Sequence, residues 1–173
     1  MQGFSKWIFK KCNWSIVGEF PGQKKYVVIV VPHTSNWDFI LGLLTRSIAG
    51  IHINFIGKEM LFKAPWGWIF RGLGGYPVKR DKNHNQVDQV IKIIKQEDEF
   101  RLAIAPEGTR SDVEKWKTGF YWIASGAEIP IIMVAFDYGE KQVRISKPFY
   151  PTGNKDTDFE FMHKFYDGVK GKK

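Results

Sequence analysis

Short apolar runs rich in β-branched residues recur along the chain. The clearest is YVVIVV (26–31), and similar runs are HINFIG (52–57), RLAIA (101–105), IPIIMVAF (129–136) and the more polar QVRIS (142–146). Runs that are apolar on both faces are typical of strands buried in a mostly parallel sheet. The pattern therefore predicts at least five strands in one sheet.

Helical patterns lie between these runs. They are NWDFILGLLTRSIA (36–49), NQVDQVIKIIKQ (85–96), DVEKWKTGFYWIASGA (112–127) and DTDFEFMHKFYDGV (156–169). Strands that alternate with helices of this length predict an α/β fold with a mixed, largely parallel sheet flanked by helices. The sequence has no internal repeat or composition break, so residues 26–173 are predicted to form a single domain.

Two apolar segments fall outside this alternation. Residues 1–25 predict an amphipathic segment in which Phe4, Trp7 and Ile8 lie within helical reach of one another and are flanked by lysines. Such a helix either lies in a membrane interface or packs on the domain itself. The segment EMLFKAPWGWIF (59–70) predicts a loop or short helices that line an apolar groove, touch lipid or pack in the core.

Composition narrows the possible partners. The formal charge of +8 favours something anionic, such as nucleic acid, anionic lipid or a phosphorylated substrate. The aromatic content of 16% suits either lipid contact or a Trp-rich core. Because no stretch reaches the roughly 20 apolar residues of a spanning helix, we expect a cytoplasmic protein in peripheral contact with an anionic membrane, at the inner face of the cell membrane. One cysteine and four scattered histidines argue against a disulfide framework or a metal site.

Two polar clusters follow directly after strong strands. VPHTSNWDF comes at the end of the first strand, and APEGTRSD comes after RLAIA. Ligand sites in open α/β sheets form beyond the carboxyl ends of the strands. The two clusters are therefore expected at the same edge of the sheet.

The first cluster contains a histidine and a carboxylate at a helix start. Pro32 ends the strand and leaves His33 in a loop, and Ser35 or Asn36 is a plausible N-cap. Asp38 then lies in the first helical turn, where it can accept a hydrogen bond from one ring nitrogen of His33. A histidine oriented in this way can take a proton from a substrate alcohol. The alternative is that the two residues only cap the helix.

Cations accompany the other polar segments. In the second cluster, Gly108 permits close approach to a ligand, and Arg110 can hold phosphate or carboxylate oxygens in a fork. A charged surface turn has the same composition. In GLGGYPVKRD (72–81), the glycines predict a tight turn, and Lys79 and Arg80 form either part of an anion site or a solvated pair.

Taken in order, these segments resemble the four boxes of the glycerolipid acyltransferase superfamily, typified by 1-acylglycerol-3-phosphate acyltransferases. His33 and Asp38 match its His-x4-Asp box, and residues 106–111 match its Pro-Glu-Gly-Thr-Arg-Ser box in full. Residues 76–80 are similar to its second box, and 129–132 to its fourth. The resemblance covers roughly residues 26–136, with Pro32 where many members have Asn.

This resemblance implies direct transfer of a fatty acyl group from acyl-CoA or acyl carrier protein to a hydroxyl of a (lyso)phospholipid-type acceptor. It implies no covalent acyl-enzyme and no cofactor besides the acyl thioester co-substrate. His33 would be the general base and Asp38 its orienting partner. The residues that bind the acceptor or shape its site would be Lys79, Arg80, Glu107, Gly108, Thr109 and Arg110.

Two other functions stay open. An esterase or thioesterase-like lipid hydrolase would use Ser35 or Ser111 as nucleophile beside His33, although the chain has no Gly-x-Ser-x-Gly elbow. A non-catalytic protein that binds anionic lipid or nucleic acid is allowed by the charge. Since no nucleic-acid module is recognisable, we expect no nucleic-acid partner.

Overall fold

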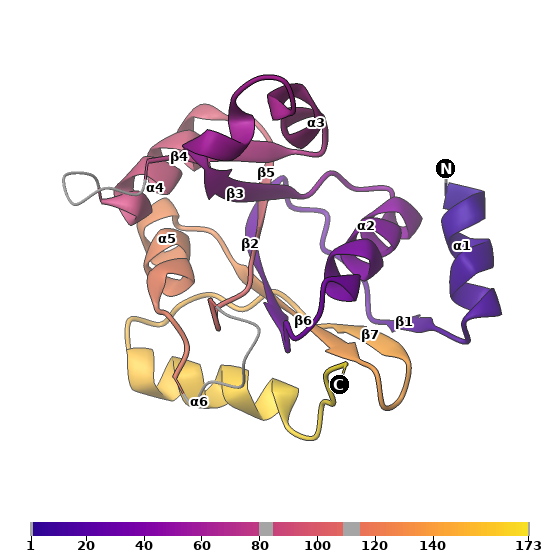
Figure 1. Cartoon of the computed structure of the whole chain (residues 1–173). Coiled ribbons are helices and arrows are strands. Elements are labelled where there is room, and N and C mark those ends of the chain that lie inside the picture. The colour runs from indigo at the N-terminus through magenta and orange to yellow at the C-terminus, as the bar shows by residue number, and fades with distance from the viewer. Residues whose placement is uncertain (1, 80–84, 109–114, 173) are drawn as a thin grey trace.

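One mixed sheet organises the chain, with strand order β1-β7-β6-β2-β5-β3-β4 (Figure 1). The computed structural model describes residues 2–79, 85–108 and 115–172. The strands are β1 (Ser15–Val17), β2 (Lys25–Val31), β3 (Asn54–Lys58), β4 (Gly75–Val78), β5 (Phe100–Ile104), β6 (Ile131–Asp137) and β7 (Gln142–Ile145). β6 and β7 pair antiparallel, and the other neighbouring strands pair parallel. The predicted mixed, largely parallel sheet is confirmed.

Helices cover both faces of this sheet (Figure 1). They are α1 (Gln2–Lys11), α2 (Trp37–Ala49), the 3-10 helix η1 (Glu59–Phe62), α3 (Gly67–Gly72), α4 (Gln86–Gln96), α5 (Gly119–Ala127) and α6 (Lys155–Tyr166). Side chains of α4, α5 and α6 form one core with the sheet, and those of α1 and α2 form a second core.

Strand β2 shows why both faces must be covered. Val27, Ile29 and Val31 belong to the core under α4, α5 and α6, whereas Tyr26 and Val28 belong to the core under α1 and α2. Successive side chains of a strand point to opposite faces, so a run without polar residues needs an apolar layer on each side. The continuous run at 26–31 therefore becomes a central strand, between β5 and β6.

The turn predicted at 72–81 is only partly present. Gly74 has a φ of +92°, as a tight turn requires, but Gly75–Val78 form a fourth parallel strand beside β3. A Cβ at Gly75 would lie 2.8 Å from Phe55 Cζ and from the Phe70 carbonyl oxygen. Glycine inside a strand commonly marks such a close approach, and close packing explains why the glycines conceal the strand.

Helix α5 starts later than the pattern at 112–127 suggests. It begins at Gly119, and Lys117 N donates instead to the Pro106 carbonyl oxygen at 2.8 Å. Trp116 precedes the helix and packs on α6, with its ring centroid 4.1 Å from that of His163. Residues 112–114 lie outside the described chain. The position of Trp116 in the helical pattern thus reflects packing on α6 and not membership of α5.

The N-terminal segment both packs on the domain and exposes aromatic side chains. In α1, Ser5 and Phe9 are buried, and Phe9 joins the core with α2. Phe4 and Trp7 are 66% and 55% exposed. Strand β1, which no pattern predicts, then adds to the edge of the sheet beside β7.

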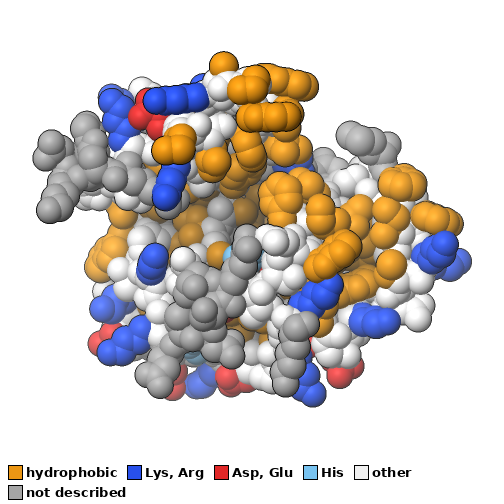
Figure 2. Space-filling view, viewed as in Figure 1, with side chains coloured by type: hydrophobic (Ala, Val, Ile, Leu, Met, Phe, Trp, Pro, Cys, Tyr) orange, Lys and Arg blue, Asp and Glu red, His pale blue; other side chains and the backbone are white. Residues whose placement is uncertain are grey.

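The segment at 59–70 forms the short helices η1 and α3, which was one of the two structures expected for it. Trp66 and Trp68 are 65% and 74% exposed, and Met60 is 76% exposed. Figure 2 shows hydrophobic side chains gathered on this face, over η1 and α3 at the top and over α2 and α1 to the right. No described helix is long and apolar enough to span a bilayer.

Candidate active site

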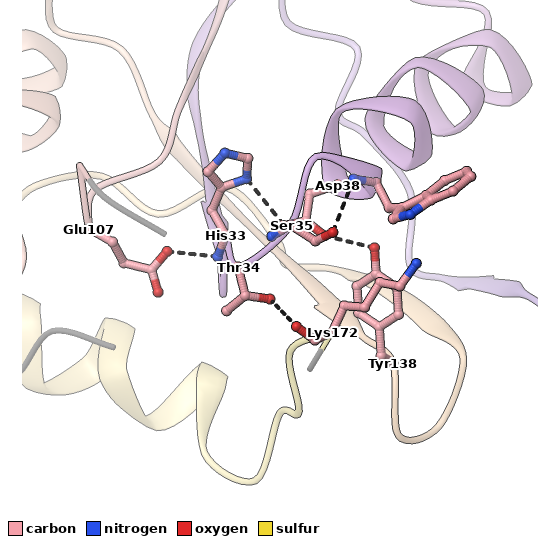
Figure 3. Close-up of polar contacts among 8 residues, drawn as sticks. His33, Thr34, Ser35, Asp38, Glu107, Tyr138 and Lys172 are labelled. Atoms are coloured by element: carbon pink, nitrogen blue, oxygen red, sulfur yellow. Dashed lines mark hydrogen bonds and ion pairs between the residues drawn. The ribbon is translucent and has the colours of Figure 1, made fainter. Parts of the chain in front are cut away.

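Three parallel neighbouring strands end at one edge of the sheet and supply polar side chains there. His33 follows β2, Glu107 follows β5, and Tyr138 follows β6 directly (Figure 3). The predicted meeting of the clusters at 31–39 and 105–112 is confirmed for their described residues, because His33 N donates to Glu107 Oε2 at 2.7 Å.

The start of α2 places Asp38. Ser35 N donates to Asp38 Oδ2 at 2.8 Å, and Trp37 N donates to Ser35 Oγ at 3.3 Å. Asn36, directly before the helix, makes no side-chain cap bond, so Ser35 Oγ is the side chain that accepts an amide at the helix start. The same cap turns the Asp38 carboxylate back toward the loop that carries His33.

His33 and Asp38 form the expected pair. His33 Nδ1 lies 3.3 Å from Asp38 Oδ2, and the ring's other nitrogen points away from the carboxylate (Figure 3). Asp38 is 2% exposed, and its Oδ1 accepts a hydrogen bond of 2.7 Å from the Tyr138 hydroxyl. Burial raises the pKa of Asp38, but hydrogen bonds from His33, Tyr138 and the Ser35 amide outweigh burial and hold this pKa below its ordinary value. Asp38 is therefore ionised at neutral pH, with one carboxylate oxygen beside His33 Nδ1.

Residues of the second cluster support the loop. Glu107 is 8% exposed, and its carboxylate holds the backbone amide of His33. Gly108 has a φ of +66°, and a Cβ there would lie 2.5 Å from Lys117 Nζ. A residue other than glycine would be strained at this φ and would displace Lys117.

Residues 171–172, near the C-terminus, also contact the loop that carries His33. Thr34 Oγ1 donates to the Lys172 carbonyl oxygen at 3.0 Å, and Lys172 Nζ lies 4.4 Å from the Trp37 ring centroid. A Cβ at Gly171 would meet Thr34 Oγ1 at 2.8 Å. Nothing in the sequence pattern indicates that residues 171–172 cover the loop of His33.

An apolar pocket of about 260 Å³ adjoins the pair, between α2 and the sheet. Its walls include both His33 and Asp38, and its remaining lining is mostly apolar. Arg46 lies in the pocket wall on α2, and its Nη1 donates to the carbonyl oxygens of Ile53 and Leu73. Burial lowers the pKa of Arg46. The α2 residues in the wall are Asp38, Phe39, Gly42, Leu43, Thr45 and Arg46.

Lys79 lies at the same sheet edge but away from this pocket. It follows β4, three strands along from β2, which corresponds to about 14 Å at the usual strand spacing. With Lys63 and Arg71 it lines a second, more polar cavity of about 310 Å³. The other predicted acceptor-binding residues, Arg80, Thr109 and Arg110, lie outside the described residues, as does Ser111. Among the described residues, no group of three or more His, Cys, Asp or Glu side chains could hold a metal ion.

The sequence also matches the model of a known protein family. The family model described as acyltransferase matches residues 16–137, which include His33, Asp38, Glu107 and Gly108. The chain belongs to the acyltransferase family. This membership confirms the resemblance to the glycerolipid acyltransferase superfamily.

Individual acyltransferases are similar to the chain in sequence and in fold. The 1-acyl-sn-glycerol-3-phosphate acyltransferase of Streptococcus pneumoniae (strain ATCC BAA-255 / R6) is 28% identical over 134 residues, which are 71% of this chain and 49% of that protein. The chain thus spans about half the length of this curated relative. The crystal structure of the 1-acyl-sn-glycerophosphate (LPA) acyltransferase PlsC from Thermotoga maritima superposes with a TM-score of 0.62 at 20% identity, covering 98% of this chain and 80% of that one. The two chains share the acyltransferase fold.

Tyr138 is the site residue that the sequence analysis missed. The signal for it was its position, since it follows the predicted strand at 129–136 almost directly. The carboxyl end of that strand lies beside the end of β2. A tyrosine carries no motif of its own, so only the strand order brings it to Asp38.

Proposed function

We propose that this protein transfers a fatty acyl group from an acyl thioester to a hydroxyl of a lysophosphatidic-acid-type acceptor. The observation that carries the proposal is the His33–Asp38 pair in the wall of an apolar pocket. The pair supplies a base for the hydroxyl, and the pocket offers an apolar site for an acyl chain. The names of the two similar acyltransferases support a lysophosphatidic acid acceptor.

The reaction needs one base and no covalent enzyme intermediate. His33 takes the proton from the acceptor hydroxyl as its oxygen attacks the thioester carbonyl carbon. Asp38 stabilises the imidazolium that forms. The tetrahedral intermediate collapses by breaking the C–S bond, and the leaving thiolate receives the proton from His33. The products are an ester and a free thiol, on coenzyme A or on acyl carrier protein.

The acyl chain would occupy the pocket under α2. Phe39, Leu43 and Phe55 line it, with Val30 and Val134 from the sheet. Each buried methylene gains about 0.8 kcal/mol, so an apolar pocket of this kind selects for a hydrocarbon chain. The carbonyl carbon would then lie next to His33.

The acceptor phosphate would lie toward the second cavity. Three cationic side chains line this cavity, at the sheet edge that also carries His33: Lys63, Arg71 and Lys79. Cationic side chains form strong charge-assisted hydrogen bonds to phosphate oxygens. Arg80 and Arg110 are proposed as additional phosphate ligands on the resemblance of their boxes alone.

Peripheral membrane contact is the third part of the proposal. The exposed Trp66, Trp68 and Met60, together with Phe4 and Trp7 of α1, form what we call the aromatic face. Trp side chains are favoured at membrane interfaces, and lysines next to them favour anionic lipid. Lys11 Nζ lies 5.0 Å from the Trp7 ring centroid, which places a cation at this face. An inner-leaflet surface would deliver the lipid acceptor to the site.

The deciding experiment measures transfer of a labelled acyl group from acyl-CoA, and separately from acyl carrier protein, to a panel of lysolipids. Wild type is compared with His33→Ala and with His163→Ala, a control on the exposed side of α6. Loss of transfer in His33→Ala alone, with the fold intact, supports the proposal. Full activity without His33 overturns it.

The same assay separates the alternatives. Ester or thioester hydrolysis without transfer would favour a hydrolase, although Ser35 Oγ accepts a hydrogen bond from the Trp37 amide, as a cap residue does. A covalent serine probe tests Ser35 and Ser111 directly. Anionic-vesicle binding without either reaction would favour a lipid-binding role.

A further inference from the structure

Tyr138 holds the oxygen of Asp38 that does not face His33. Its hydroxyl donates to Asp38 Oδ1 at 2.7 Å, while Asp38 Oδ2 lies 3.3 Å from His33 Nδ1 and accepts the Ser35 amide. Both carboxylate oxygens therefore have partners, and Oδ1 is held by the phenol (Figure 3).

We propose that Tyr138 is a positioning residue for the acyl transfer, which keeps the Asp38 carboxylate oriented toward the His33 ring. This inference rests on the proposed function, because it assigns Tyr138 a role in that reaction. Tyr138 does not itself touch the reacting atoms. It acts through Asp38, which in turn orients the base.

The chemistry of the carboxylate gives this contact its effect. The terminal torsion of an aspartate is broad, so an unanchored carboxylate turns easily. A hydrogen bond from a neutral donor to an ionised acceptor is short and about twice as strong as a neutral one. With Oδ1 held by Tyr138, Oδ2 stays where Nδ1 of His33 can donate to it. The imidazole is then kept in the tautomer whose other nitrogen accepts the substrate proton.

Tyr138 remains a hydrogen-bond donor at neutral pH. Burial and, next, its hydrogen bond to the Asp38 carboxylate raise the pKa of Tyr138 well above its ordinary value. The phenol therefore stays protonated. The pKa of Asp38 is held low, so the pair remains a neutral donor beside a charged acceptor.

Parts of the chain other than the active-site loop hold Tyr138 in place. Its ring packs edge-on against Trp14, with centroids 5.0 Å apart and an interplanar angle of 86°. Its amide donates to the Lys170 carbonyl oxygen at 2.8 Å. The following turn is closed by Asp137 Oδ1, which accepts the Gly139 amide at 3.0 Å. The tyrosine is thus preorganised before any substrate binds.

The chain contains a matched control for a purely structural role. Tyr121 in α5 donates to Asp158 Oδ2 in α6 at 2.9 Å, in the core on the other side of the sheet. Loss of either hydroxyl removes one tyrosine–carboxylate hydrogen bond. Only the loss at 138 affects a carboxylate that contacts a catalytic base.

The test compares Tyr138→Phe with Tyr121→Phe and wild type. For Tyr138→Phe we expect kcat to fall about tenfold to a hundredfold, as for loss of an orienting contact, with KM for both substrates unchanged. The downfield proton resonance of the His33 ring N–H, assigned by its absence in His33→Ala, should move or broaden. Tyr121→Phe should lower the melting temperature but leave kcat and this resonance unchanged. The phenylalanine ring retains the contact with Trp14, so the fold of Tyr138→Phe should be intact.

The outcomes separate this inference from the proposed function. If Tyr138→Phe matches wild type in kcat and in the His33 resonance, the positioning role is overturned while acyl transfer stands. Equal losses of kcat in both tyrosine variants would also overturn it. If the wild type transfers no acyl group, the proposed function fails, yet a displaced resonance in Tyr138→Phe alone still supports the positioning of Asp38 by Tyr138.

Discussion

The Glu107 carboxylate accepts a hydrogen bond from the His33 backbone amide at 2.7 Å, across 74 positions of sequence. One residue of the Pro-Glu-Gly-Thr-Arg-Ser box thus acts on the His-x4-Asp box through the backbone. Glu107 is buried, and its hydrogen bond fixes the backbone from which the His33 side chain extends. The two boxes form one structural unit at the ends of adjacent strands.

This contact predicts different effects for two substitutions at Glu107. Glu107→Ala leaves the His33 amide without that acceptor and should lower the free energy of unfolding by about 1–3 kcal/mol, and kcat with it. Glu107→Gln retains a side-chain oxygen that can accept the same bond, so its losses should be smaller. Denaturant unfolding and acyl transfer measure both, with the exposed Glu160→Ala as control. Equal activity of Glu107→Ala and wild type would contradict the anchoring role.

Because Gly42 lies in the pocket wall, a larger side chain there is predicted to change which acyl-chain lengths the protein accepts. A Cβ there would lie 3.8 Å from Phe136 Cζ, an ordinary contact, so Gly42→Ala fits and should stabilise α2 by about 1 kcal/mol. Gly42→Leu projects into the pocket and should shift the preference among acyl-CoA substrates toward shorter chains. Gly3→Leu in α1, where a Cβ meets nothing within 4 Å, is the control. An unchanged chain-length profile in Gly42→Leu would show that the chain binds elsewhere.

The lowered pKa of Asp38 predicts that the stability of the fold depends on pH in the acid range. Its pKa in the folded protein lies below the ordinary value of 3.8. A depressed pKa contributes stability that is present above the ordinary value and is lost as the pH falls through the folded-state pKa. Melting temperatures from pH 2 to 6 should therefore fall more steeply toward acid in wild type than in Asp38→Asn, which does not titrate there. Parallel curves would contradict an ionised, hydrogen-bonded Asp38.

The second cavity predicts the effect of removing a cation. Lys79→Gln should raise KM roughly tenfold for a phosphorylated acceptor, in line with the loss of one charged hydrogen bond. An acceptor without phosphate should show no such change. Kinetics with both acceptors, beside Lys95→Gln on the exposed side of α4, measure the difference. A KM that rises equally for both acceptors would indicate a change in the fold instead of a lost phosphate contact.

The aromatic face predicts reduced membrane binding when its tryptophans are removed. Trp66→Ala combined with Trp68→Ala should lower flotation with anionic liposomes, because both side chains are largely exposed and apolar. Trp122→Ala, on α5 and 49% exposed, is the matched control. Flotation equal to that of the wild type would refute docking through this face.

Local sequence determined most of the strands and helices. The continuous apolar run at 26–31 can only be satisfied by a strand covered on both faces, and β2 occupies that position. The spacing from His33 to Asp38, with Ser35 between them, also indicated that the two side chains can meet, and the structure places them 3.3 Å apart. A helix cap is a local interaction within a few residues, so its geometry can be inferred from sequence.

Only the tertiary structure decided which side chains from distant segments come into contact. Strand order places Tyr138 beside Asp38, and no sequence period or spacing predicts that contact. The sequence placed the clusters of His33 and Glu107 at one edge of the sheet, but it did not specify the hydrogen bond between them. β4 was concealed because the glycines that allow its close packing also suit a turn. Contacts across neighbouring strands depend on the order in which those strands pair, and local propensity does not specify that order.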